Sequence, residues 1–249
     1  MTPGAPRILV SCEHGGNRIP AAFRRYFRGR RAQALLASHR GHDPGALVLA
    51  RDLARACAAP LFYSTVTRLL IELNRSPRHP RLYSEITGAL PAPVRSRLLA
   101  RYYWPYRTTL EAGIDAAVRS GHRVIHISAH SFTPVLNGRQ RHADVGFLYD
   151  PRRKPETRFC RAWQQALRGG DPALIVRPNY PYRGVSDGLT THLRRRFTAD
   201  CYIGVELEVN QKHALGNPRA WRRLRRLLSS SLQSAIESEK ATRRVMTAS

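Results

Sequence analysis

The sequence predicts an α/β fold: a single domain with a mixed, mostly parallel central sheet and helices on both faces. Three observations predict this fold. Short apolar runs of strand length alternate with longer segments of helical periodicity. The run from Arg123 to Ala129 is mostly apolar, as expected for a central parallel strand that is buried on both faces. No internal repeat is visible, so we expect one domain over residues 1–249.

In the first half of the chain, the apolar run RILV predicts a strand over 7–12, and a basic helical stretch follows over 21–37. A helix is expected over 43–58, because Asp43 suits the N-cap and Pro44 the first helical position. The runs at 61–65 and 69–73 are short and apolar, which predicts two more strands.

In the second half, residues 93–119 have helical periodicity, and Pro105 should kink or divide that helix. Strands are expected at 123–129, 144–149, 173–176 and 202–209, with helices at 156–167 and 218–239. Residues 179–188 (NYPYRGVSDG) are rich in turn-forming residues and predict a loop.

Composition narrows the class of protein. Lys and Arg number 42 against 17 Asp and Glu, which gives a net charge of +25 and favours anionic partners. The chain has no apolar run long enough to span a membrane and no secretory signal pattern, so we expect no membrane association. Its four cysteines are widely scattered, without a CxxC pair, which is typical of a reduced, cytoplasmic protein.

Polar side chains follow several of the predicted strands. His14 comes just after the first strand, and the two glycines behind it would allow close approach to a metal or substrate. Asp43 precedes a helix, where it could act as a cap or direct its carboxylate at a cation. Ligands bind at the carboxyl ends of strands in open α/β sheets, so these residues are candidates for one site.

Two further strands carry paired ionisable residues. His126 and His130 lie on one face of a strand but four residues apart, so we do not expect them to bind the same ion. His130 is nearer the carboxyl end and is the better ligand, whereas His126 is expected to be a buried, hydrogen-bonded histidine. Glu206 and Glu208 share a face of the last strand, and two buried carboxylates require a nearby cation.

Taken together, seven segments resemble the N-formylglutamate amidohydrolase family, which is similar in fold to zinc carboxypeptidases and aspartoacylases. In chain order they are CEHGGNRIP, HDPGA, ELNRSP, AHSFTP, DVGFLYDP, RPNYPYRG and ELEVNQ, from Cys12 to Gln211. The C-terminal helix, at about 218–240, lies outside the resemblance. No single block would be specific, but their order and number are.

The resemblance implies a zinc carboxypeptidase-like fold with one zinc ion per chain, bound by His14, His130 and an acidic residue. Asp43 is the preferred third ligand, because the local alternative, Asn17, is a poor ligand for zinc. The resemblance also implies that Asn74 and Arg75 bind the carboxylate of a small anionic substrate. Loop residues Asn179, Tyr182, Arg183 and His192 are candidates to complete the substrate pocket.

The implied reaction is hydrolysis of the amide bond of an N-formyl or other N-acyl acidic amino acid, or a related small carboxylate. Glu208 is the expected catalytic base and Glu206 the alternative. Where the family often has an arginine two residues beyond this Glu, the chain has Asn210. Two other hypotheses are a peptide or cell-wall amidase of the same fold and a nucleic-acid-binding protein on a hydrolase-like scaffold.

Overall fold

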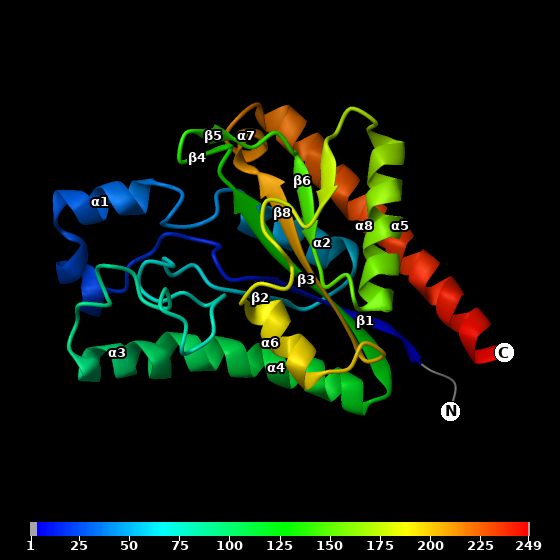
Figure 1. Ribbon diagram of the computed structural model, residues 1–249, viewed down its shortest axis with the longest axis horizontal. Helices are drawn as coiled ribbons and strands as arrows, with labels where there is room; N and C mark the ends of the chain where they lie inside the picture. The colour runs from blue at the N-terminus through cyan, green and yellow to red at the C-terminus, as the bar shows by residue number, and fades with distance from the viewer. Residues whose placement is uncertain (1–3, 249) are drawn as a thin grey trace.

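The computed structural model describes residues 4–248, and its core is a six-stranded sheet in the order β2-β1-β3-β8-β6-β7 (Figure 1). All neighbouring strands run parallel except β6 and β8, which pair antiparallel. A separate two-stranded hairpin, β4 and β5, extends from the end of β3. The strands are β1 (Gly4–Cys12), β2 (Leu61–Tyr63), β3 (His122–Phe132), β4 (Val135–Leu136), β5 (Arg139–Gln140), β6 (Val145–Leu148), β7 (Val176–Pro178) and β8 (Tyr202–Asn210).

Helices cover both faces of this sheet, which confirms the predicted fold class. Apolar residues of α2, α5 and α8 pack on one face, and those of α4 and α6 on the other. The helices are η1 (Ala21–Phe27, 3₁₀), α1 (Arg30–Ala37), α2 (Ala46–Ala56), α3 (Ala92–Leu98), η2 (Leu99–Tyr103, π), α4 (Trp104–Arg119), α5 (Lys154–Gly170), α6 (Leu189–Arg196), α7 (Gln211–Ala214) and α8 (Pro218–Ala248). No described helix is both long and apolar enough to cross a membrane.

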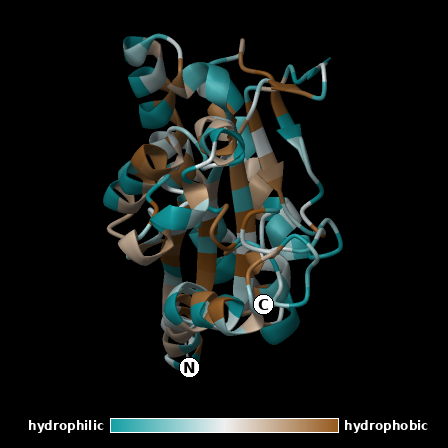
Figure 2. Ribbon diagram, turned by 90° about the vertical axis from the view of Figure 1, so that its left-hand side faces the viewer, coloured by the Kyte–Doolittle hydropathy of each residue, from teal (hydrophilic) through white to brown (hydrophobic). Residues whose placement is uncertain are grey.

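A lobe on the left of Figure 1 consists of η1, α1, α3 and the long irregular segment 64–91. It has its own apolar cluster, which includes Phe27, Leu70 and Leu98. In Figure 2 the central strands carry brown segments among paler and teal ones, and the surrounding helices carry both teal and brown. The apolar side chains of these helices pack against the sheet, where folding removes their surface from water.

The strand expected at 69–73 is wrong. These residues are buried, but they form a loop whose backbone groups bond to another loop instead of to a strand. The Glu72 amide donates to the Leu82 carbonyl at 2.9 Å, and the Ser84 hydroxyl donates to the Leu69 carbonyl at 2.6 Å. A short apolar run indicates burial, and hydrogen bonds from a distant segment decide whether it becomes a strand.

Several predicted boundaries also differ. Asp43 does not cap α2, because Gly45 is the N-cap, with a φ of 82°. The basic stretch 21–37 divides into η1 and α1, and α6 was not predicted. The helical segment 92–119 changes to a π turn at η2, directly before Pro105 in the first turn of α4. A widened turn is one way for a helix to accommodate a proline, which lacks an amide hydrogen.

Candidate active site

Three of the predicted ligands converge where β1 and β3 end. Nitrogen and oxygen atoms of His14, Asp43 and His130 lie within 4.8 Å of one another, and all three side chains are buried. The Asp43 Oδ2 atom lies 3.3 Å from Nδ1 of His14 and 3.0 Å from Nδ1 of His130. Two imidazole nitrogens and a carboxylate oxygen thus face one point, as in a metal site with open positions.

Backbone contacts bring these residues together from separate loops. The amide of Asp43 donates to the carbonyl of His14 at 3.0 Å, which joins the loop after β1 to the segment before α2. Gly15 and Gly16 were expected to allow close approach of a metal or substrate, but the close approach that they allow is between two loops. A Cβ on either would come within 3.0 Å of the carbonyl of Ser64 or Thr65, so these glycines let the loop pack against the segment after β2.

Each histidine has a carboxylate at its second ring nitrogen. The Nε2 atom of His14 donates to Glu72, and Nε2 of His130 lies 3.0 Å from Glu13. Glu13 also accepts from the hydroxyls of Ser128 and Tyr106, each at 2.6 Å. These bonds orient both rings with Nδ1 toward Asp43, the arrangement that holds metal-binding histidines in one tautomer.

The electrostatics of this cluster favour a cation. Burial lowers the pKa of His130, but hydrogen bonds to Asp43 and Glu13 outweigh it and raise that pKa well above the ordinary value. Burial raises the pKa of Asp43, but the charge of His14 and the bond to His130 bring it well below its usual range. The anionic side chains therefore require positive charge between them, which either protons or a metal ion can supply.

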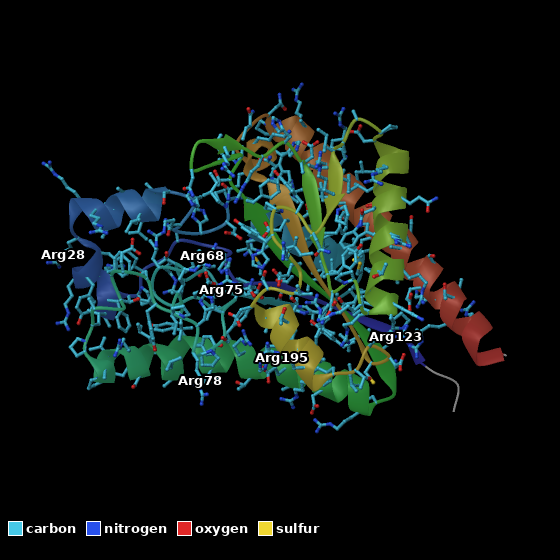
Figure 3. The ribbon with its side chains drawn as sticks, in the orientation of Figure 1. Arg28, Arg68, Arg75, Arg78, Arg123 and Arg195 are labelled. Carbon is cyan, nitrogen blue, oxygen red and sulfur yellow. The ribbon has the colours of Figure 1, made fainter. Side chains whose placement is uncertain are left out.

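Arg68 fixes the orientation of two of the carboxylates. Its guanidinium donates to Asp43 Oδ1 at 3.1 Å and to Glu72 Oε2 at 2.8 Å. Because Oδ1 is held by Arg68, the other oxygen of Asp43 remains directed at the two histidines. Figure 3 shows Arg68 and Arg75 between the sheet and the left-hand lobe.

The two glutamates of β8 have different environments. Glu208 pairs with His130 in the sheet register, and its Oε2 atom is buried without a hydrogen-bond partner among residues 4–248. Burial raises the pKa of Glu208 to about 8, with a smaller contribution from the charges of Asp43 and Glu206. Glu206 instead accepts a hydrogen bond from the Thr190 hydroxyl at 2.6 Å. Glu208 thus presents a buried carboxylate oxygen to the His14–Asp43–His130 group without a partner among residues 4–248, whereas one oxygen of the half-buried Glu206 is engaged by Thr190.

Asn74 and Arg75 lie beside the cluster. The Asn74 Nδ2 atom is 3.5 Å from Nε2 of His130, and its side-chain oxygen accepts from the Leu189 amide at 2.7 Å. The Arg75 guanidinium donates to the backbone carbonyl of Asp187, and the residue is half-buried. The pair is held against the start of α6.

The remaining predicted pocket residues have other contacts. The Asn179 side chain accepts from the amides of Tyr149 and Gly184 and so shapes its own loop. Arg183 is exposed on that loop, and His192 lies 2.9 Å from Glu111 on α4. The side chain of Asn17, the alternative ligand, donates to the Leu36 carbonyl at 2.6 Å.

Other side chains near the cluster were not predicted. Glu13 and Glu72 belong to two of the seven family-like blocks, and the only signal in the sequence was that Glu13 directly precedes His14 and Glu72 lies two residues before Asn74. Arg68 lies directly before the segment 69–73 that was expected to be a strand. His126 is buried and hydrogen-bonded to Tyr202 and Ser11, each at 2.8 Å, in accord with the sequence-based expectation.

Arg141, from the loop after β5, was also missed. Its guanidinium lies 5.2 Å from the Tyr182 ring centroid and 5.9 Å from that of Phe132. The side chain of Asn210 donates to the Arg141 carbonyl at 3.0 Å, so the residue that replaces the family's arginine supports a different arginine.

The fold and the site define the class. A buried His-Asp-His group and a glutamate whose Oε2 atom has no partner among the described residues lie at the carboxyl ends of parallel strands, an arrangement suited to hydrolysis. The chain belongs to the N-formylglutamate amidohydrolase family, whose model matches residues 6–214. This confirms the family that the seven sequence blocks indicated.

Solved structures share the fold of this chain. A gene product of Agrobacterium tumefaciens is 28% identical, with a TM-score of 0.79 over 94% of this chain and 92% of its own. An N-formylglutamate amidohydrolase from Ralstonia eutropha is 18% identical, with a TM-score of 0.71 over 97% of this chain and 96% of its own; at that identity the likeness shows the fold. A search of curated proteins finds no match.

Proposed function

We propose that this chain is a zinc-dependent amidohydrolase that removes a formyl or other acyl group from an N-acyl acidic amino acid or related small carboxylate. The observation that carries the proposal is the convergence of His14, Asp43 and His130 beside the unpartnered carboxylate of Glu208. Family membership supports the reaction type, and the donor atoms support the metal.

The residues fit zinc by their chemistry. Two imidazoles and one carboxylate leave positions open for water and substrate, as in catalytic rather than structural zinc sites. Glu72 and Glu13 would hold the two histidines in the ligating orientation. Zinc bound there would supply Lewis-acid polarisation of the amide carbonyl and make water a nucleophile at neutral pH.

Glu208 is the proposed proton carrier. Its free oxygen would accept a proton from the attacking water and pass it to the leaving nitrogen. Burial raises the pKa of Glu208 to about 8 without a metal, and a cation bound beside it would lower that pKa so that the carboxylate can accept the proton. Glu206 is engaged by Thr190 and would not share this role.

Two arginines are proposed to bind the anionic groups of the substrate. Arg75 is held by the Asp187 carbonyl and would use its remaining donors on a substrate carboxylate. Arg141, held through its backbone by Asn210, would bind a second carboxylate. A substrate with two carboxylates, such as an N-acylated acidic amino acid, matches this pair better than one with a neutral side chain.

The test combines metal analysis with hydrolysis assays of N-formyl-L-glutamate and N-formyl-L-leucine. We expect about one zinc per wild-type chain and preference for the glutamate compound. Glu208→Gln should keep its zinc and lose about 10²- to 10⁴-fold in kcat, the range for removal of a general base. Glu206→Gln is the matched control on the same face of the same strand, and its kcat should stay within a few-fold of wild type.

Three results would contradict parts of this proposal. Wild-type kcat in Glu208→Gln would remove Glu208 as the proton carrier. Full activity of protein that has been stripped of metal would show that the reaction does not need a metal. Equal turnover of the two substrates would remove the proposed role of Arg75 and Arg141 in specificity.

A further inference from the structure

A cleft of about 500 Å³ opens on the left-hand lobe, between η1 and the continuous helix α3–η2. Its floor is apolar: Phe23 and Val94 are buried at 7% and 8% exposure within the cluster of that lobe. Ala22 and Ala100 contribute small side chains to its walls, which leave the space open. None of the residues that line it belongs to the His14–Asp43–His130 group.

Three arginines and no acidic residue line this cleft. Arg25 stacks over the Tyr26 ring at 4.7 Å and donates to its hydroxyl at 2.6 Å. Arg97 and Arg101 are exposed, and no ion pair within residues 4–248 joins either to a carboxylate. Three guanidinium groups around an apolar floor create a local positive potential that an anion can lower.

The arginine-rich composition alone does not produce this feature. A second cleft, of about 410 Å³ between β1 and α8, also has basic side chains in its lining, but it includes Glu237. There Lys240 pairs with Glu237 at 2.7 Å, so one of the cations already has an anionic partner. The cleft at η1 differs because its lining has no carboxylate.

A π turn forms part of the wall. Ala100 and Arg101 both belong to η2, the π-helical turn between α3 and α4. Such turns are less regular than α-helix and are frequent at functional sites. The π turn is an observation independent of the arginine charges, and two of its residues line the cleft.

We propose that this cleft is a binding site for a small amphipathic anion. An aromatic or branched acyl group would pack on Phe23 and Val94, and a carboxylate, phosphate or sulfonate group would lie against Arg97 and Arg101. The volume is in the range of small-molecule pockets, which are mostly apolar with a few polar groups that orient the ligand. The proposal is independent of the reaction proposed for the zinc site.

The test is titration of the full chain with 8-anilinonaphthalene-1-sulfonate, an aromatic sulfonate, followed by fluorescence and calorimetry. We expect saturable binding at one principal site. Arg97→Gln/Arg101→Gln should weaken it by about tenfold, because two charge-assisted contacts are lost. The matched control is Arg222→Gln/Arg223→Gln, which removes the same charge from exposed positions on α8 and should leave the dissociation constant within twofold.

Two simpler ligands separate the contributions to binding. N-phenyl-1-naphthylamine lacks the sulfonate, and inorganic sulfate lacks the apolar body; each should bind at least tenfold more weakly than the combined probe. Equal weakening by both double variants would assign binding to overall charge and overturn the proposal. Equally tight binding of either simple ligand would overturn it as well. Circular dichroism and the melting temperature check that the variants are folded.

Discussion

The two faces of the β3–β8 pair contrast sharply, although their residues alternate along the same strands. On one face, Ile127 and Val205 are opposite each other and pack beneath α2, α5 and α8. On the other, Ser128 lies opposite Glu206 and His130 opposite Glu208, all buried or half-buried. The first face gains stability from burial of apolar area, whereas the second loses stability unless each polar group has a partner.

This comparison shows how one pair of strands serves two purposes. Packing of the apolar face fixes the backbone of β3 and β8. The side chains on the polar face of the same strands are therefore held on a rigid backbone. The polar face then needs only a few contacts from loops, such as Glu13 to His130 and Asp43 to His130, to complete a site. Substitutions on the two faces should therefore change different measured quantities.

The largest expected effect is on the polar face. Asp43→Ala removes the oxygen that faces both histidines and leaves Arg68 without one of its partners. We expect loss of stoichiometric zinc and a fall in kcat/KM of about 10³-fold or more. Metal analysis and the N-formyl-L-glutamate assay measure both quantities. Glu237→Ala, on the exposed part of α8, is the control and should retain wild-type zinc and activity.

Ile127→Ala tests the opposite face. Deletion of a fully buried side chain should lower the free energy of unfolding by about 2–5 kcal/mol, because transfer energy is lost and a cavity remains. The folded variant should still bind one zinc per chain. Urea unfolding measures the loss of stability, and metal analysis measures whether zinc binding is retained. Loss of zinc without loss of stability would show that the two faces are not separable in this way.

His126 gives a pH-dependent test on the polar face. Burial, with a smaller contribution from Arg194, lowers its pKa to about 4, although the charge of Glu13 opposes this. The folded state thus binds the proton more weakly than the unfolded chain, whose histidine titrates near 6.5. Stability should fall as pH drops from about 6.5 to 4, by about 2 kcal/mol between pH 7.5 and 5.

The control for this pH dependence is His126→Gln, which keeps a polar side chain that does not titrate. Its unfolding free energy should change less over the same pH interval than that of the wild type. Parallel pH profiles for the two proteins would assign the acid sensitivity to other groups.

The smallest expected effect comes from Glu13, which orients the ring of His130. Glu13→Gln keeps a partner near Nε2 of His130 but removes the charge. We expect zinc affinity to fall by about 10- to 100-fold, as for other groups that orient metal-binding histidines. A competition titration with a chelator measures this affinity directly. Unchanged affinity would show that Ser128, 2.9 Å from the same nitrogen, is sufficient to orient the ring.

Much of the fold could be predicted because period-two and helical patterns reflect burial directly. The mostly apolar run that became β3 and the paired acids of β8 are examples. The segment 69–73 was wrongly predicted as a strand, because its backbone partners, around Leu82 and Ser84, belong to a loop that has no periodic signal. The nucleic-acid hypothesis, the cytoplasmic location and the single-domain boundaries stay predictions.

The sequence by itself determined the residue types of the site and their order. His14, Asp43, His130 and Glu208 could be selected because strand ends and family-like blocks identify them. Only the tertiary structure decided how they are partnered: Glu72 and Glu13 at the second ring nitrogens, Arg68 on Asp43, and, within the described part of the chain, no partner for Glu208 Oε2. The physical reason is that a pattern along the chain reports burial, whereas a pKa or a ligand geometry depends on groups from loops far apart in sequence.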